Sequence, residues 1–277
     1  MSIALIAGAG ALPLALVEAA RAAGAPRPFV AALDGFAPEG LAPDLTFRIE
    51  RLYPFFAALH ERGVTRIAFA GAVRRPRLDP ALFDPLTAGI VPRLMATLAQ
   101  GDDATLREVI ALFEEDGFAI LGAGEVAPAL LPPEGVLAGR ITPRDQQDAA
   151  RAALIVSALG RVDVGQGCVV QQGLCLGAET LAGTDAMLAG VAALPQDLRP
   201  DPAGGRGLLF KAPKPLQDRR IDLPALGVQS VRNAARAGLG GIAWEAGGTL
   251  CLDLPAMRAA AEETGLFLWS RPPGTGA

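Results

Sequence analysis

The sequence predicts an α/β protein of two domains, the first built on a parallel sheet of the doubly wound type. Short apolar runs alternate with segments of helical spacing along residues 2–126, which is the pattern of βαβ units. A stretch rich in proline and glycine, residues 127–140, then interrupts this alternation. Helices and strands resume beyond it in a different rhythm, and we therefore place a domain boundary near residue 130.

The first domain is expected to cover residues 1–130. It begins with the apolar run 2–8, which ends in glycine and predicts a strand. Residues 12–24 have helical spacing closed by Gly24, and predict a helix after a tight turn. The same criteria predict strands at 27–35 and 66–71, a helix at 53–63, helices between 87 and 115 that stop and restart at Gly-Asp-Asp 101–103, and a strand with a loop at 117–126.

Residues 131–141 are expected to form a linker, and residues 142–277 a second α/β domain. The first helix of this domain, 142–160, has Thr142 as its N-cap and Asp145 where a capping box needs an acid. Further strands are predicted within 168–179 and at 207–213 and 266–269, and further helices at 184–194, 230–238 and 254–265. The run 241–253 predicts a hairpin that turns at Gly247 and Gly248.

Composition narrows the class of protein. Of 277 residues 51% are hydrophobic, which is enough for a packed core. The net charge of −4 gives no general attraction to polyphosphate, so no nucleic-acid partner is expected. The N-terminus lacks the features of a secretory signal and no long apolar run occurs, which favours a cytoplasmic protein without a membrane span.

Cysteine and histidine are too few for a zinc site of the usual type. The three cysteines, Cys168, Cys175 and Cys251, contain no Cys-x-x-Cys pair, and His60 is the single histidine. We expect all three cysteines to be small core residues. A metal would then be held by oxygen atoms, which favours magnesium or manganese.

Two turns with glycine follow predicted strands, and so lie at the edge of the sheet where α/β proteins bind ligands. Residues 8–13, Gly-Ala-Gly-Ala-Leu-Pro, would bring phosphate to the amides of a helix N-terminus, although Pro13 stands where a dinucleotide fingerprint has glycine. Residues 71–76 offer Arg74 and Arg75 as a clamp for a diphosphate. The alternatives are a turn that needs glycine only for its shape, and a solvated basic loop.

Two further segments gather carboxylates. Asp102 and Asp103 suit a magnesium ion or a ribose hydroxyl, and Asp103 also suits a plain helix N-cap. Glu179, Thr184 and Asp185 surround a glycine turn. Helix capping explains Thr184 most simply, and leaves Glu179 and Asp185 for a polar site.

The segment 208–227 combines charge with stiffness. It carries two lysines, two arginines and two aspartates among three prolines, whose rings fix φ. Cations that offset phosphate charge, followed by an acid that holds a metal or orients water, are what phosphoryl transfer requires. Lys211 and Lys214 suit the first role and Asp222 the second, whereas residues 218–220 also suit a solvated surface.

These segments together resemble a known family. Residues 6–24, 71–76, 101–106, 177–188 and 211–227, in this order and at these separations, are similar to the UDP-2,3-diacylglucosamine pyrophosphatases of the LpxI type. The similarity extends from Ile3 to Trp269.

The resemblance implies a lipid A pathway enzyme that hydrolyses the pyrophosphate bond of UDP-2,3-diacylglucosamine. The products would be UMP and 2,3-diacylglucosamine 1-phosphate (lipid X), and the cofactor Mg²⁺ or Mn²⁺. It also implies a Rossmann-like N-terminal domain, a C-terminal α/β domain for catalysis and lipid binding, and a homodimer. A cytoplasmic enzyme of this kind is compatible with a peripheral contact with the inner membrane.

The resemblance also assigns roles to residues. Asp222 matches the acid of the family's Arg-x-Asp-Leu-Pro motif, and is the expected catalytic residue and metal ligand. Lys211 and Lys214 match its phosphate-contacting lysines. The expected substrate-binding residues are Gly10, Ala11, Leu12, Gly71, Ala72, Arg74, Asp102, Asp103, Gln171, Glu179, Thr184 and Asp185.

Two other functions stay open on sequence alone. Gly8, Gly10 and Asp34 would suit an NAD(P)-dependent oxidoreductase, although the glycine pattern is incomplete. A non-catalytic protein that binds acyl-sugar nucleotides or lipids would hold acyl chains in the apolar second domain.

Overall fold

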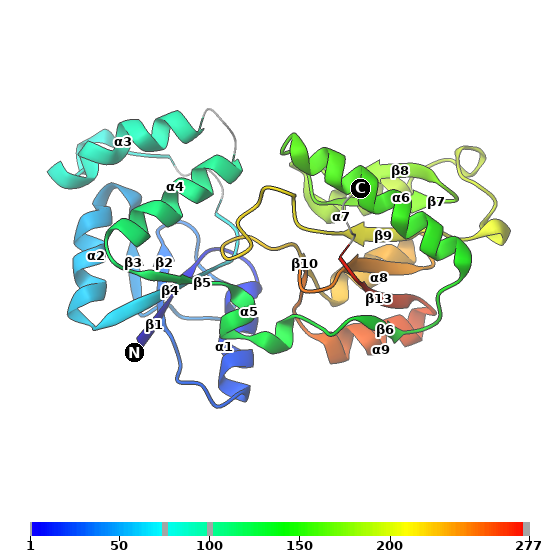
Figure 1. Ribbon diagram of the computed structural model, residues 1–277, viewed down its shortest axis with the longest axis horizontal. Coiled ribbons are helices and arrows are strands. Elements are labelled where there is room, and N and C mark those ends of the chain that lie inside the picture. Colours follow the sequence, from blue (N-terminus) through cyan, green and yellow to red (C-terminus); the bar gives the residue numbers. More distant parts are fainter. Residues whose placement is uncertain (1, 74–76, 99–101, 274–277) are drawn as a thin grey trace. The chain divides into compact units, whose positions relative to one another are not determined.

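The structure is a computed structural model that describes residues 2–73, 77–98 and 102–273 (Figure 1). The chain divides into two compact units, one formed by Met1–Ala129 with Asp218–Asp222 and the other by Leu130–Gln217 with Leu223–Ala277. Each unit has its own sheet and its own hydrophobic core. The expected α/β fold with two domains is confirmed.

The first unit is built on a five-stranded parallel sheet with the order β3-β2-β1-β4-β5. Its strands are β1 (Ser2–Ala7), β2 (Phe29–Leu33), β3 (Leu45–Phe47), β4 (Val64–Ala70) and β5 (Ala119–Leu121). The order reverses between β1 and β4, so the turns after these two strands flank the point where doubly wound sheets bind ligands. Strand β3 was not predicted, because three residues are too few to show a period.

Helices cover this sheet and form its core together with the strands. They are α1 (Leu12–Ala22), α2 (Leu52–Glu61), α3 (Pro85–Leu98), α4 (Asp102–Glu115) and α5 (Ala123–Val126). Phenylalanine rings join α2 to its neighbours. Phe55 stacks on Phe47 of β3 with 3.9 Å between the ring centroids, and Phe56 meets Phe113 of α4 edge-on with 4.8 Å between the centroids. This packing fixes the sheet whose edge carries the candidate site.

Glu50 is a buried carboxylate that fixes the loop after β4. Its side chain is 3% exposed, and its Oε1 accepts hydrogen bonds from the Asp79 amide at 2.9 Å and from Arg48 Nη2 at 3.3 Å. Burial by itself would raise the pKa of Glu50, but these hydrogen bonds outweigh it and lower the pKa. Glu50 is therefore ionised at neutral pH.

We expect Glu50→Gln to lower the free energy of unfolding by about 2 kcal/mol at neutral pH, because buried hydrogen bonds to a charged group are lost. Since the pKa of Glu50 is lower in the folded state, its contribution exists above the unfolded pKa and is lost as pH falls through the folded pKa. Urea unfolding from about pH 7 to pH 3 should therefore show the difference from wild type shrinking with acid. A difference that does not change with pH would contradict this account, and Glu61→Gln on the exposed end of α2 serves as the control.

The second unit contains a six-stranded mixed sheet with the order β6-β13-β11-β9-β7-β8. Its strands are β6 (Gly135–Ala138), β7 (Gly167–Gln171), β8 (Leu174–Ala178), β9 (Leu208–Lys211), β11 (Gly241–Glu245) and β13 (Phe267–Arg271). The central strands β9, β11 and β13 are parallel, whereas β6, β7 and β8 run antiparallel to their neighbours. Lys211 is the last residue of β9, and so lies at the carboxyl edge of the parallel strands.

Four helices cover the two faces of this sheet. They are α6 (Pro143–Arg161), α7 (Gly183–Ala192), α8 (Val228–Arg236) and α9 (Leu254–Thr264). The side chains of β9 alternate, with Leu208 and Phe210 in the core beneath α6 and Leu209 in the core beneath α7, α8 and α9. The predicted capping box of α6 is confirmed: Thr142 Oγ1 accepts from the Asp145 amide, and Asp145 Oδ2 accepts from the Thr142 amide.

The structure corrects three expectations in the second unit. The predicted hairpin 241–253 is wrong: β11 has parallel neighbours on both sides, and β12 (Leu250–Cys251) pairs in parallel with β10 (Ala225–Leu226). The turn at Gly247 and Gly248 was predicted correctly, but a turn does not determine which strand the next strand pairs with. The expected linker, residues 131–141, contains β6, which pairs with β13. Cys175 is exposed because β8 is an edge strand, whereas the other two cysteines are buried as expected.

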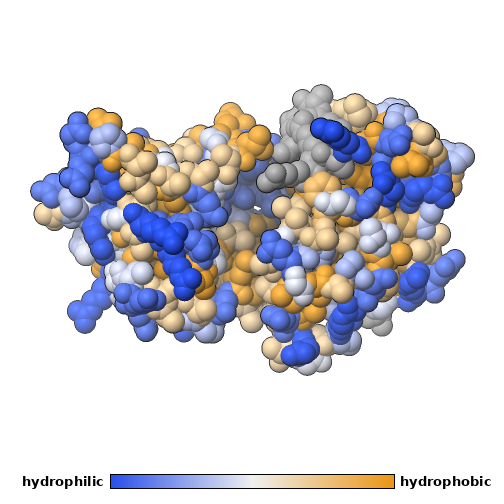
Figure 2. Space-filling model, turned by 180° about the vertical axis from the view of Figure 1, so that it is seen from behind, coloured by the Kyte–Doolittle hydropathy of each residue, from blue (hydrophilic) through white to orange (hydrophobic). Residues whose placement is uncertain are grey.

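The surface mixes hydrophilic and hydrophobic side chains on both units, as the view from behind shows (Figure 2). Large apolar side chains that are exposed include Leu86 and Met95 of α3 and Leu181 before α7. Across the residues that the structure describes, no helix is both long and apolar enough to cross a membrane.

Candidate functional site

Two glycine turns meet at the carboxyl edge of the first sheet. Gly8–Leu12 follows β1, and Gly71 and Ala72 follow β4. The amides of Ala9 and Ala72 donate to each other's carbonyls at 2.9 Å, which joins the turns in a small antiparallel bridge. The structure thus brings together five of the predicted substrate-binding residues, Gly10, Ala11, Leu12, Gly71 and Ala72.

Glycine is required here for close approach as well as for backbone shape. A Cβ atom on Gly8 would lie 2.7 Å from the carbonyl oxygen of Ala72, and one on Gly71 would lie 2.6 Å from that of Gly8. Gly10 and Gly71 also have φ of +94° and +95°, which side chains disfavour. The close approach sets the backbone of both turns at the N-terminus of α1, where Leu12 is the first helical residue. The predicted phosphate contacts of Arg74 and Arg75 lie outside the described residues.

The segment Asp218–Asp222 belongs to the first unit, although the residues before and after it belong to the second. It lies beside Gly122, the residue that follows β5, because a Cβ atom on Gly122 would be 3.5 Å from Arg220 Cα. Ile221 packs against the phenylalanine-rich core of the first unit. The segment therefore occupies the carboxyl edge of the parallel sheet, the edge that also carries the two glycine turns.

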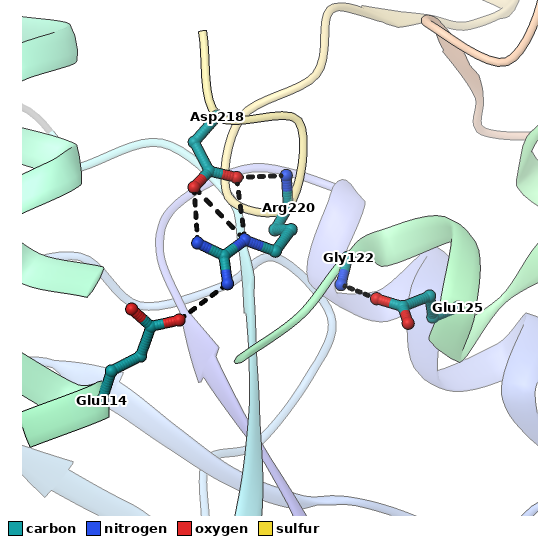
Figure 3. Close-up of polar contacts among 5 residues, drawn as sticks. All are labelled: Glu114, Gly122, Glu125, Asp218 and Arg220. Atoms are coloured by element: carbon teal, nitrogen blue, oxygen red, sulfur yellow. Dashed lines mark hydrogen bonds and ion pairs between the residues drawn. The ribbon is translucent and has the colours of Figure 1, made fainter. Parts of the chain in front are cut away.

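Arg220 anchors this segment. Its Nη2 donates to Asp218 Oδ2 at 2.7 Å and its Nη1 to Glu114 Oε1 of α4 at 2.7 Å (Figure 3). The Arg220 guanidinium lowers the pKa of Asp218, and the two carboxylates raise the pKa of Arg220. The reading of Asp218 and Arg220 as merely solvated is wrong: these side chains fold the turn and hold it to α4.

Asp222 is the last residue of this packed segment. It is half-buried, and its amide donates to the Asp218 carbonyl at 3.4 Å within the turn. The anchored turn 218–221 therefore controls the position of the Asp222 backbone. Lys211 and Lys214 belong to the other unit, so the structure divides the predicted catalytic groups between the two units.

In the Gly-Asp-Asp segment, Asp103 does not cap the following helix, which was the simplest expectation. Helix α4 begins at Asp102, so Asp103 lies inside its first turn and is not the N-cap. Asp103 forms an ion pair with Arg107 one turn later. The side chain of Asp102 lies outside what the structure describes, and its predicted substrate contact stays a prediction.

The second unit contains a buried cluster of Lys211, Glu179 and Thr184. Lys211 is 4% exposed, and its Nζ donates to Thr184 Oγ1 at 2.7 Å and lies 3.3 Å from each carboxylate oxygen of Glu179. Thr184 in turn donates to Glu179 Oε1 at 2.9 Å. Thr184 is thus no helix cap: α7 has Ala182 at its N-cap, and the hydroxyl serves the cluster. Glu179 thus lies in a polar cluster, as expected, together with Thr184, and the predicted contacts of both residues with substrate stay predictions.

Two glycines make room for this cluster, and sequence reasoning missed both. A Cβ atom on Gly167 would lie 2.5 Å from Glu179 Oε2, and one on Gly165 would lie 2.1 Å from the Glu179 carbonyl oxygen. The segment Gly165-Gln166-Gly167 carried the signal, since two glycines at the start of a buried strand indicate a close approach.

Lys214 is held by Asp163, another residue that the sequence did not single out. Lys214 Nζ lies 2.5 Å from Asp163 Oδ1, and Asp163 has a φ of +56°, which aspartate tolerates better than most side chains. The turn that carries Lys214 packs on α6, because a Cβ atom on Gly160 would lie 2.7 Å from Pro215 Cδ. Pro215 thus takes part in the packing that holds Lys214.

The remaining predicted residues have structural partners. Asp185 accepts a hydrogen bond from Asn233 at 2.8 Å on the exposed side of α7. Gln171 is buried, donates to the carbonyls of Pro200 and Gly205, and accepts from Arg199. Asp185 and Gln171 thus join elements of the second unit, and the predicted contacts of both residues with substrate stay predictions.

Comparison with known proteins identifies the family. Residues 2–130 match the LpxI N-terminal domain, and residues 133–269 match the LpxI C-terminal domain. The chain is 42% identical over 269 residues to the protein named UDP-2,3-diacylglucosamine pyrophosphatase LpxI from Caulobacter vibrioides, and the match covers 95% of each chain. The chain therefore belongs to the LpxI family.

Proposed function

We propose that this protein hydrolyses the pyrophosphate bond of UDP-2,3-diacylglucosamine and gives UMP and 2,3-diacylglucosamine 1-phosphate, a step of lipid A biosynthesis. The name of its Caulobacter relative supports the substrate and the bond that is cleaved. The motifs shared with that family cover both units of the chain.

One observation of the fold carries the proposal furthest. The segment that contains Asp222 crosses to the first unit and packs at the carboxyl edge of its sheet, beside Gly122. That edge is where doubly wound proteins bind nucleotides. A catalytic carboxylate supplied to this edge is what hydrolysis of a nucleotide diphosphate requires, and a protein that only binds lipid has no need of it.

The proposed roles follow from the chemistry of each group. Asp222 orients or deprotonates the water that attacks the α-phosphorus, and the phosphorus–oxygen bond to the sugar phosphate breaks. The ammonium of Lys214, presented by its rigid turn, offsets negative charge on the phosphates. We propose that the Lys211 ammonium also offsets the negative charge of the phosphates. Its contacts with Glu179 and Thr184 would hold the ammonium in place before substrate binds.

The chain's own donors suit a magnesium ion that arrives with the substrate. Among residues 2–73, 77–98 and 102–273, no group of three or more His, Cys, Asp or Glu side chains could hold a metal ion. Mg²⁺ often takes only one or two carboxylates and completes its shell with water and substrate phosphates. Asp222 would hold it in that manner, and the ion would supply charge neutralisation at the phosphates.

This arrangement predicts that metal binds strongly only together with nucleotide. We expect EDTA to abolish hydrolysis and Mg²⁺ or Mn²⁺ to restore it. Differential scanning fluorimetry should show a shift of the melting temperature with Mg²⁺ plus a UDP-sugar that exceeds the sum of the two separate shifts. Full activity after exhaustive chelation, or a large shift with Mg²⁺ alone, would contradict it.

An acylated substrate also brings the protein to a membrane surface. We propose a peripheral contact with the inner membrane, which the exposed side chains of Leu86 and Met95 on α3 support. We also propose that the protein assembles as a homodimer. Sedimentation with vesicles tests the first, and light scattering after size exclusion tests the second.

The function itself is tested by incubation of the purified protein with UDP-2,3-diacylglucosamine and Mg²⁺. We expect the protein to release UMP, and chromatography measures this release. Substrate that is bound but remains intact would favour the lipid-binding alternative instead.

A further inference from the structure

A small pocket lies at the carboxyl end of β2 in the first unit. It is lined by Leu33, Asp34, Arg48, Ile49, Glu50 and Arg77. Asp34 directly follows β2, so its carboxylate stands at the edge of the sheet where doubly wound proteins bind ligands. None of these six residues is among those assigned to substrate by family resemblance.

The pocket presents fixed charges of both signs. Arg48 Nη1 lies 2.6 Å from Asp34 Oδ2, and Arg48 Nη2 lies 3.3 Å from the buried Glu50. The Nε atom of Arg48 is buried without a hydrogen-bond partner among the described residues. Arg77 adds an exposed guanidinium. The pocket therefore offers carboxylate acceptors and guanidinium donors side by side.

The loop that follows β2 and the pocket residue Asp34 also contacts the first glycine turn. The loop after β2 bridges to that turn at Pro38 and Gly10, and the Glu39 amide donates to the Gly10 carbonyl at 3.1 Å. A nucleotide whose phosphates lie at the glycine turns would thus extend its nucleoside along this edge toward Asp34.

A ligand for this pocket has to be both donor and acceptor. A phosphate group would meet repulsion from Asp34 and Glu50, whereas each hydroxyl of a vicinal diol can donate to a carboxylate and accept from a guanidinium. In doubly wound folds an acid about 20 residues after the glycine turn binds ribose hydroxyls, and Asp34 follows Gly10 by a similar interval.

We propose that this pocket binds the ribose diol of the substrate's uridine, with Asp34 as the acceptor from its hydroxyls. The inference rests on the proposed function for the identity of the base. The same residue favoured an oxidoreductase, because NAD-binding folds also use an acid at this place to bind a ribose hydroxyl.

Isothermal titration with UMP and with 2′-deoxy-UMP tests the inference without hydrolysis. We expect wild-type protein to bind UMP about tenfold more tightly than the deoxy compound, the loss that follows when a charged hydrogen bond is left unmade. Asp34→Asn should weaken UMP binding and bring the ratio of the two affinities close to one. The variant is expected to fold, because the Asp34–Arg48 pair is largely solvent-exposed.

Asp116→Asn is the matched control, since Asp116 pairs with His60 at 2.7 Å just before β5, at the opposite edge of the same sheet. It should keep the wild-type ratio. Equal affinities in wild type, a ratio unchanged by Asp34→Asn, or failure of UMP to bind would overturn the inference. Preference for NAD⁺ over UMP would assign the pocket to a dinucleotide instead, which also overturns it.

The outcomes separate this inference from the proposed function. Hydrolysis of the UDP-sugar with equal binding of UMP and 2′-deoxy-UMP would sink the inference and leave the function intact. If the protein prefers UMP over 2′-deoxy-UMP through Asp34 but releases no UMP from the UDP-sugar, the inference stands and the proposed function fails.

Discussion

Replacement of Asp222 by alanine is expected to lower the rate of hydrolysis by about 10³-fold or more, because the group that activates water or holds the metal is removed. The fold should survive, since the turn that carries Asp222 is held by Arg220, Asp218 and Ile221. Asp222→Asn keeps the shape of the side chain and removes its charge. It should be nearly as inactive, and initial rates of UMP release measure both variants.

A matched control separates this effect from a general loss of charge. Asp197 is an exposed acid of the second unit, and Asp197→Ala should retain wild-type rates. Binding of UMP and the melting temperature should change little in either Asp222 variant. Near wild-type turnover in Asp222→Ala would remove Asp222 from the catalytic role.

Lys211→Met is expected to destabilise the second unit by about 3 to 5 kcal/mol, because Glu179 would be left as a buried carboxylate without its ammonium partner. Calorimetric unfolding is the suitable measurement, since two units can melt in separate transitions. The double change Lys211→Met with Glu179→Gln removes the stranded charge, and should recover a large part of the loss.

The double variant also distinguishes a structural lysine from one that contacts phosphate. If Lys211 acts on the phosphates, the restabilised variant stays strongly impaired in UMP release. Arg93→Met breaks the ion pairs of a half-exposed arginine with Glu115 and Glu108, and should cost about 1 kcal/mol. A Lys211→Met variant no less stable than Arg93→Met would show that the buried cluster does not hold this unit together.

The regular elements could be predicted because their information is local. The apolar run of β1, the helical spacing of α1 and the capping box of α6 are each contained in a few neighbouring residues. The short strands β3 and β6 and the partner of β12 could not be predicted, since edge pairing depends on which strands are free to accept a neighbour.

The sequence offered candidate residues for the site, but it did not predict how the chain arranges them. The crossing of residues 218–222 rests on Ile221 entering a distant core and on Arg220 reaching Glu114, 106 residues away along the chain. No local pattern contains that contact. Likewise, Thr184 looked like a helix cap because its competing partners, Glu179 and Lys211, lie on other elements.

Hydrolysis in ¹⁸O-labelled water tests the central claim most directly. Purified protein, UDP-2,3-diacylglucosamine and Mg²⁺ should yield UMP that carries one ¹⁸O atom and unlabelled 2,3-diacylglucosamine 1-phosphate, as measured by mass spectrometry. Asp222→Ala should yield both products at a rate lower by about 10³-fold or more. Intact substrate after prolonged incubation with folded wild-type protein, or the label in the sugar phosphate, would contradict attack of water on the α-phosphorus.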